Sequence, residues 1–81
     1  MSLTNEEKYR KSYVEALEIE EKIVNEKLEY NSIPEWDSIG HMTLISAIEE
    51  SFDISIDTDD IIDFSSYNKG KEILKKYSID F

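Results

Sequence analysis

Residues 37–52 read Asp-Ser-Ile-Gly-His-Met-Thr-Leu-Ile-Ser-Ala-Ile-Glu-Glu-Ser-Phe, the clearest helical pattern in the chain. At 100° per residue, its apolar side chains form one narrow face. The residues of this face are Leu44, Ile45, Ile48 and Phe52. We expect it to be buried, whereas Ile39 falls outside it and Met42 lies at its edge. The stretch therefore predicts an amphipathic helix from Ser38 to about Ser51, with an exposed isoleucine beside its first residue.

Three further helical segments are expected around this one. Thr4 can cap a first helix, and apolar residues at helical spacing would allow that helix to continue as far as Leu28. Pro34 excludes a helix interior just before it, because proline restricts the preceding residue. Residues 57–63 predict a short acidic helix with its apolar side at 61, 62 and 64. Ser65 or Ser66 can cap a last helix over residues 67–77.

Length and composition bound what the chain can be. Its 81 residues, 40% of them hydrophobic, suffice for a single small domain spanning residues 1–81. The absence of cysteine excludes disulfides and thiolate metal sites and is compatible with a reducing cytoplasm. We expect no signal peptide and no membrane insertion, since the charged start lacks an apolar segment. A cytoplasmic monomer is the resulting expectation.

The distribution of charge is more informative than the net charge of −10. Residues 28–68 contain ten acidic side chains and no Lys or Arg. Binding of nucleic acid is not expected, because phosphates require clustered basic side chains. A partner protein with a basic surface is the natural expectation, since opposite charge steers association. The alternative is that the acids only keep a small protein soluble.

Several kinds of chemistry are poorly supported. Ser38 and His41 are close enough on a helix to interact, but no Gly-x-Ser-x-Gly motif is present and a small bundle offers little room for a substrate cleft. We expect His41 to be a surface residue. Residues 57–63 begin like a calcium-binding EF-hand loop, but Ile62 occupies the position that requires glycine. We therefore expect neither an enzyme nor a metal site.

The order and spacing of several residues resemble the acyl carrier protein family over nearly the full chain. The matching features are Asp37-Ser38-Ile39, Leu44, Ile45, Glu49-Glu50, Phe52, Ile54, Asp59-Asp60 and the capped last helix. The resemblance is to a specialised free-standing member. It implies an all-α fold, a small antiparallel four-helix bundle with a long loop after helix one and a short third helix. On this basis we expect the first helix to end near Glu18 and the loop to cover residues 19–37.

The resemblance also implies a function. In this family the serine of the Asp-Ser pair carries 4′-phosphopantetheine, which a phosphopantetheinyl transferase takes from coenzyme A; here that serine is Ser38, with Asp37 beside it. The thiol of the arm then holds an acyl or aminoacyl group as a thioester. The implied partners are enzymes of lipid or secondary-metabolite biosynthesis that load and transfer this group.

The resemblance suggests further roles for surface and core residues. Recognition of basic partner surfaces is expected from Ile39, Met42, Glu49, Glu50, Asp53, Asp59 and Asp60. A cargo pocket between the second and third helices would be lined by Ile45, Ile56, Ile61 and Phe64, with plain core packing as the alternative. The family often has acids two and five residues after the serine, where this chain has Gly40 and Thr43. Trp36 is either a core or loop anchor, or a contact for the arm or for a partner.

Two other functions are compatible with the sequence. The chain could be a carrier of the peptidyl or D-alanyl type, loaded by an adenylating enzyme. It could also be an acidic helical adaptor that binds a basic partner and is never modified.

Overall fold

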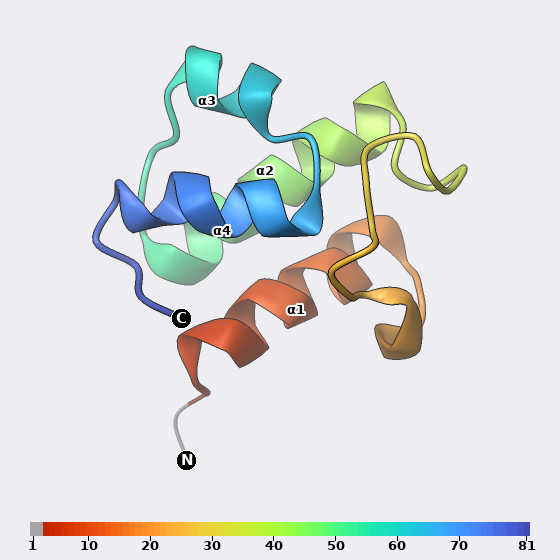
Figure 1. The fold of residues 1–81 in the computed structure, drawn as a ribbon, viewed down its shortest axis with the longest axis horizontal. Coiled ribbons are helices and arrows are strands. Elements are labelled where there is room, and N and C mark those ends of the chain that lie inside the picture. Colours follow the sequence, from red (N-terminus) through yellow and green to blue (C-terminus); the bar gives the residue numbers. More distant parts are fainter. Residues whose placement is uncertain (1–2) are drawn as a thin grey trace.

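The protein is all-helical in a computed structural model, which describes residues 3–81. The helices are α1 (Asn5–Leu17), the 3₁₀ turn η1 (Glu21–Ile23), α2 (Ser38–Phe52), α3 (Thr58–Asp63) and α4 (Tyr67–Lys75). Figure 1 shows α1 on one side of the molecule and α3 on the opposite side, with α2 and α4 between them. None of the helices in residues 3–81 combines the length and apolar character that crossing a bilayer requires.

The helix ends are set by local capping. The Thr4 hydroxyl accepts the Glu7 backbone N–H at 3.1 Å, and the Glu7 side chain accepts the Thr4 backbone N–H at 2.9 Å. The helix ends at Leu17, and Glu18 adopts a left-handed conformation with φ 53°, so the predicted end near Glu18 is confirmed. Ser66 caps α4 by accepting the Lys69 N–H at 2.9 Å.

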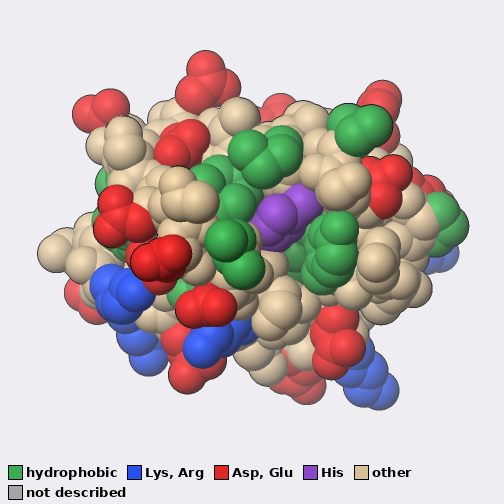
Figure 2. Space-filling view, turned by 90° about the horizontal axis from the view of Figure 1, so that it is seen from above, with side chains coloured by type: hydrophobic (Ala, Val, Ile, Leu, Met, Phe, Trp, Pro, Cys, Tyr) green, Lys and Arg blue, Asp and Glu red, His purple; other side chains and the backbone are tan. Residues whose placement is uncertain are grey.

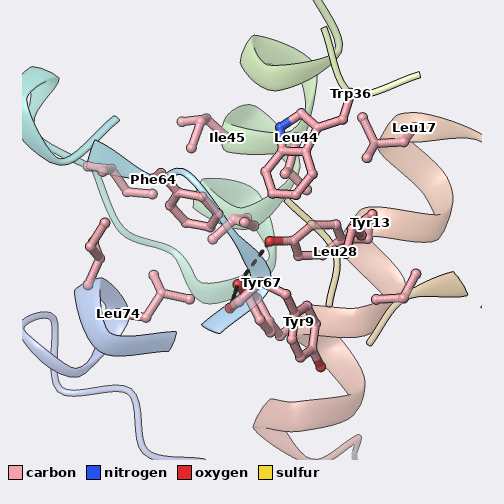
Figure 3. Packing of buried hydrophobic residues seen from close by; sticks show 14 of the residues in the cluster. Tyr9, Tyr13, Leu17, Leu28, Trp36, Leu44, Ile45, Phe64, Tyr67 and Leu74 are labelled. Atoms are coloured by element: carbon pink, nitrogen blue, oxygen red, sulfur yellow. Dashed lines mark hydrogen bonds between the residues drawn. The ribbon is translucent and has the colours of Figure 1, made fainter. Parts of the chain in front are cut away.

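The core lies between α1, α2 and α4 and is rich in aromatic side chains (Figure 3). Tyr9, Tyr13 and Trp36 are fully buried. The rings of Tyr13 and Trp36 meet edge to face with their centroids 5.3 Å apart, which is a favourable aromatic geometry. The expected buried face of the second helix is confirmed at Leu44, Ile45 and Ile48, which are at most 1% exposed, whereas its last residue, Phe52, is half-buried.

Residues 18–37 connect α1 to α2 and are fastened to the segment before α4. The Tyr30 N–H donates to the Ser65 carbonyl, and the Tyr67 N–H donates to the Leu28 carbonyl, both at 2.9 Å. Leu28 is also buried, together with Val24. These contacts hold the second half of the connection in place, and it delivers Tyr30 and Trp36 to the start of α2.

The short third helix corrects one expectation. Ile62 was expected on an apolar inner side with Ile61 and Phe64, but its side chain is 73% exposed. Helix α3 has only six residues, so adjacent residues cannot all face the core at 100° per residue. Phe64, just past the end of the helix, is 1% exposed, and Ile61 is half-buried.

Candidate functional site

Ser38 is the first residue of α2 and its side chain is exposed. The preceding residue, Asp37, caps the helix: its carboxylate accepts the Gly40 N–H and its carbonyl accepts the His41 N–H, both at 2.8 Å. The capping role therefore belongs to Asp37, and the Ser38 hydroxyl is not needed for it. The first backbone N–H groups of a helix lack intrahelical acceptors and favour an anion. The position suits a serine that carries a phosphate group.

Position 40 requires glycine because the backbone of Glu35 passes close to it. A Cβ atom at this position would lie 2.2 Å from the Glu35 carbonyl oxygen and 3.1 Å from Cδ2 of Leu17. The chain before α2 therefore packs directly against the first turn of that helix. This contact is a physical reason for a glycine two residues after Ser38.

Ser38 lines an open apolar hollow of about 380 Å³ between α2, α3, the connection before α2 and the two residues that follow α3. Its lining residues are Tyr30, Ser38, His41, Met42, Ile61, Ile62, Phe64 and Ser65. Figure 2 shows hydrophobic side chains gathered around the chain's single histidine on this face. Of the four residues expected to form a cargo pocket, Ile61 and Phe64 line the hollow. The other two, Ile45 and Ile56, are buried in the core at 1% and 7% exposure and do not line it.

His41 links three parts of the chain at the bottom of this hollow. The Trp36 indole N–H donates to Nδ1 of His41 at 2.9 Å, and Nε2 of His41 lies 2.8 Å from the Ile61 carbonyl oxygen. Since an indole can only donate and a carbonyl can only accept, the ring is neutral with its hydrogen on Nε2. His41 is half-buried, so it is less exposed than the surface histidine that the sequence predicts.

The same two bonds bear on the idea of serine–histidine chemistry. A general base must have a free ring nitrogen within reach of the serine hydroxyl. Here Nδ1 accepts from Trp36 and Nε2 faces the Ile61 carbonyl. The geometry therefore gives His41 the role of a structural link between segments.

The sequence contains a pattern that indicates partial burial of His41. His41 precedes Leu44 and Ile45 by three and four residues, so it extends the buried face of the helix by one turn. A polar residue on such a face needs hydrogen-bond partners. The first partner is Trp36, whose side chain is 0% exposed; of its two possible roles, the structure shows the core anchor.

The residues expected to recognise partners differ in exposure. Ile39 is 78% exposed, which confirms the prediction of its orientation, and Met42 is 53% exposed. The acidic residues Glu50, Asp53 and Asp59 are exposed as well. Together these five residues place apolar and acidic groups on the surface of α2 and the start of α3.

Two other expected recognition residues are engaged within the fold. The Glu49 carboxylate accepts the Ile56 N–H at 2.8 Å. Asp60 is 7% exposed and bonds to the Lys76 ammonium at 2.5 Å and to the Tyr77 hydroxyl at 2.7 Å. These hydrogen bonds from Lys76 and Tyr77 hold the pKa of Asp60 below its ordinary value. Asp60 is therefore not displayed for a partner, contrary to expectation, and instead joins α3 to the end of α4.

We find no metal-binding site in the part of the chain that the structure describes. Within residues 3–81, no group of three histidine or acidic side chains is arranged to hold a metal ion.

Comparisons of the chain with models of known families, with curated proteins and with solved structures find no match. A function for Ser38 therefore rests on the resemblance that the chain's residues carry and on the geometry around the serine.

Proposed function

We propose that the chain is a carrier protein of the acyl carrier type, with 4′-phosphopantetheine attached to Ser38. The arm holds an acyl or aminoacyl group as a thioester and presents it to partner enzymes in the cytoplasm. The observation that carries this proposal is the placement of Ser38: it is exposed, at the first position of a helix that Asp37 caps, and it borders an apolar hollow.

The chemistry of attachment fits this position. The Ser38 oxygen attacks the β-phosphorus of coenzyme A, and the bond to the adenosine bisphosphate breaks. That bisphosphate leaves, and the serine proton goes to a base on the transferase. The product is a phosphodiester whose negative charge lies at the positive end of α2. The transferase and its magnesium ion supply the reaction, while this chain supplies the oriented hydroxyl.

The proposed partners are recognised by charge and by exposed apolar side chains. Ile39 and Met42 flank Ser38 at the start of α2, and Glu50, Asp53 and Asp59 add negative charge around the far end of α2 and the start of α3. A basic patch on a transferase or loading enzyme would be steered to this surface. Asp37 would contact the same basic groups beside the modified serine.

The proposed fold is the antiparallel four-helix bundle of carrier proteins. Three features support it: twenty residues between α1 and α2, a six-residue α3, and a serine at the start of α2. The proposal makes the chain a non-enzymatic monomer whose reactive thiol belongs to the cofactor, consistent with a sequence that contains no cysteine.

The test is an intact-mass measurement after incubation with coenzyme A, magnesium and a broad-specificity phosphopantetheinyl transferase. We expect one added phosphopantetheine on the parent chain and none on Ser38→Ala. Ser46→Ala is the matched control, because Ser46 is an exposed serine on the same helix, and it should be modified like the parent. A folded parent that its own organism's transferase also leaves unmodified would overturn the proposal and favour the unmodified adaptor.

The type of loading enzyme is a second question for the same protein. A carrier of the peptidyl or D-alanyl type would accept an aminoacyl group from an adenylating enzyme and ATP. A transacylase-loaded carrier would instead accept a group from an acyl thioester. Mass measurements of the modified protein with each type of donor distinguish them.

A further inference from the structure

His41 lies between the hollow beside Ser38 and the core, and its ring makes hydrogen bonds to residues on both sides. On one side the ring is bonded to Trp36, which is fully buried, and on the other to the Ile61 carbonyl of α3. The ring is stacked on Trp36 with an interplanar angle of 23° and meets the edges of Tyr30 and Phe64 at centroid distances of 5.4 and 6.0 Å. His41 therefore forms the floor of the hollow and fastens α3 to α2.

We propose that His41 is a specificity-determining residue that keeps the core closed to the cargo. The group carried on Ser38 then stays in the surface hollow, and the protein favours short acyl or aminoacyl groups over long alkyl chains. This inference rests on the proposed function in one respect, that Ser38 carries the arm.

Entry of a long chain between α2 and α3 would require two unfavourable changes. The chain would have to separate Nε2 of His41 from the Ile61 carbonyl, leaving a donor and an acceptor without partners in an apolar setting. It would also have to displace Leu44, Ile45 and Phe64, which are already packed at 1% exposure or less. A short group in the hollow requires neither change.

The second attachment of α3 strengthens this closure. Asp60, one residue before Ile61, bonds to Lys76 and Tyr77 beyond the end of α4. The short helix is thus fastened to α2 by Ile61 and to the C-terminal segment by Asp60. A rotation of α3 away from α2, which would open a path to the core, has to break one of these attachments.

The residues that line the hollow indicate which group can occupy it. Ser38 itself is a lining residue, so a group tethered there is held at high local concentration beside the apolar side chains of Met42, Ile61 and Ile62. The hollow is open to solvent along the exposed side chains of Met42 and Ile62. It can cover part of a short chain but does not enclose a long one.

The absence of cysteine allows a direct test that needs no transferase. Ser38→Cys introduces a unique thiol, to which propyl or dodecyl chains can be attached as disulfides with alkyl methanethiosulfonates. Methyl NMR spectra then report where the chain lies. We expect both chains to shift the methyl resonances of Met42 and Ile62, and neither to shift those of Ile45 and Ile56 in the core.

Removing the His41 side chain should change this result. In the Ser38→Cys, His41→Ala protein, the dodecyl chain is expected to shift the Ile45 and Ile56 methyl resonances and to raise the melting temperature above that of the propyl conjugate. Trp36→Phe, which removes the indole donor and keeps an aromatic ring, is the second variant should His41→Ala unfold. Met42→Ala is the matched control, because it alters the hollow and leaves the hydrogen bonds of His41 intact.

Two results would overturn the inference. One is a dodecyl chain that shifts the core methyl resonances with His41 in place, and the other is a core that stays closed in both His41→Ala and Trp36→Phe. Failure of the proposed function is recognised separately, by the absence of phosphopantetheine on the parent chain. Where the arm is attached, hydroxylamine should cleave butyryl and dodecanoyl thioesters at similar rates; cleavage of the dodecanoyl form slower by about tenfold would also contradict the inference.

Discussion

Trp36 donates its indole hydrogen to Nδ1 of His41 across 2.9 Å, joining the residues before α2 to the buried face of that helix. The bond leaves Nε2 of the same ring to meet the Ile61 carbonyl of α3 at 2.8 Å. The connection before α2, α2 itself and α3 thus meet at one imidazole. The start of α2, where Ser38 lies, is therefore positioned by tertiary contacts as well as by its own cap.

The tautomer of His41 is a direct consequence of this geometry. We expect long-range ¹H–¹⁵N spectra at neutral pH to show the hydrogen on Nε2 and an unprotonated Nδ1, because the indole can only donate to Nδ1. Trp36→Phe removes that donor, but the Ile61 carbonyl still accepts from Nε2, so the hydrogen should stay on Nε2 in this variant as well. A hydrogen on Nδ1 in the parent protein would contradict the arrangement.

Gly40→Ala should destabilise the protein, although alanine is the better helix former. The new Cβ would lie 2.2 Å from the Glu35 carbonyl oxygen, which belongs to the backbone and cannot turn aside. We expect urea unfolding to show a loss of about 1–3 kcal/mol. Ser46→Ala, on the exposed side of α2, is the control and should change stability by less than about 0.5 kcal/mol. Equal stability of Gly40→Ala and the parent would show that the two segments are not in contact.

Asp37 has two separable roles, capping α2 and presenting a charge beside Ser38. Asp37→Asn keeps a side chain that caps well, so unfolding free energy should stay the same while the rate of phosphopantetheine transfer falls. Asp37→Ala should lose about 1 kcal/mol of stability as well. The measurements are urea unfolding and the initial rate of mass increase with the transferase. An unchanged transfer rate in Asp37→Asn would leave the residue with the capping role alone.

Asp60 makes the stability of the fold sensitive to acid. Hydrogen bonds from Lys76 and Tyr77 lower its pKa in the folded protein, so the unfolded chain takes up the proton first as the pH falls. The stabilisation is therefore complete above the ordinary aspartate pKa of about 3.9 and is lost as the pH falls through the lower folded value. We expect Asp60→Asn to destabilise the protein at about pH 6 and to differ progressively less from the parent as the pH falls below about 3.9.

The control for that experiment is Asp59→Asn, since Asp59 is a neighbouring but exposed acid. Thermal unfolding followed by circular dichroism across the pH range gives the comparison. A difference between Asp60→Asn and the parent that does not change with pH would refute the assignment.

Tyr9 connects α1 to the start of α4 through its hydroxyl group. The hydroxyl donates to the Tyr67 carbonyl at 2.6 Å and lies 2.9 Å from the Tyr13 hydroxyl, in a fully buried setting. Tyr9→Phe leaves both groups without this partner, and we expect a loss of about 1–3 kcal/mol in urea unfolding. Tyr30→Phe is the matched control, because Tyr30 is 37% exposed. Equal effects of the two substitutions would contradict this role for Tyr9.

Local features of the chain were predictable because their causes lie within a few residues. Thr4 and Ser66 cap helices by bonding to N–H groups three residues later. The spacing of Leu44, Ile45 and Ile48 defined the buried face of α2 and left Ile39 exposed. The choice of Ser38 and Asp37 as the candidate site came from the resemblance to carrier proteins, and the mass experiment is its test.

The remaining features depended on contacts between distant parts of the chain. Asp60 is buried because Lys76 and Tyr77 reach it from beyond α4, and nothing in the acidic stretch itself distinguishes it from exposed Asp59. Ile62 is exposed because the short α3 turns only one side to the core.

By itself the sequence determined where the helices begin, the caps at Thr4 and Ser66 and a serine at the start of α2, since hydrogen bonds and periodicity act over one or two turns. The end of the first helix near Glu18 was expected only from the resemblance to carrier proteins, because its apolar spacing continues to Leu28. The tertiary structure alone decided that His41 and Trp36 lie between the Ser38 hollow and the core. Their bonds join residues 36, 41 and 61, and such a meeting exists only once the segments have packed against one another.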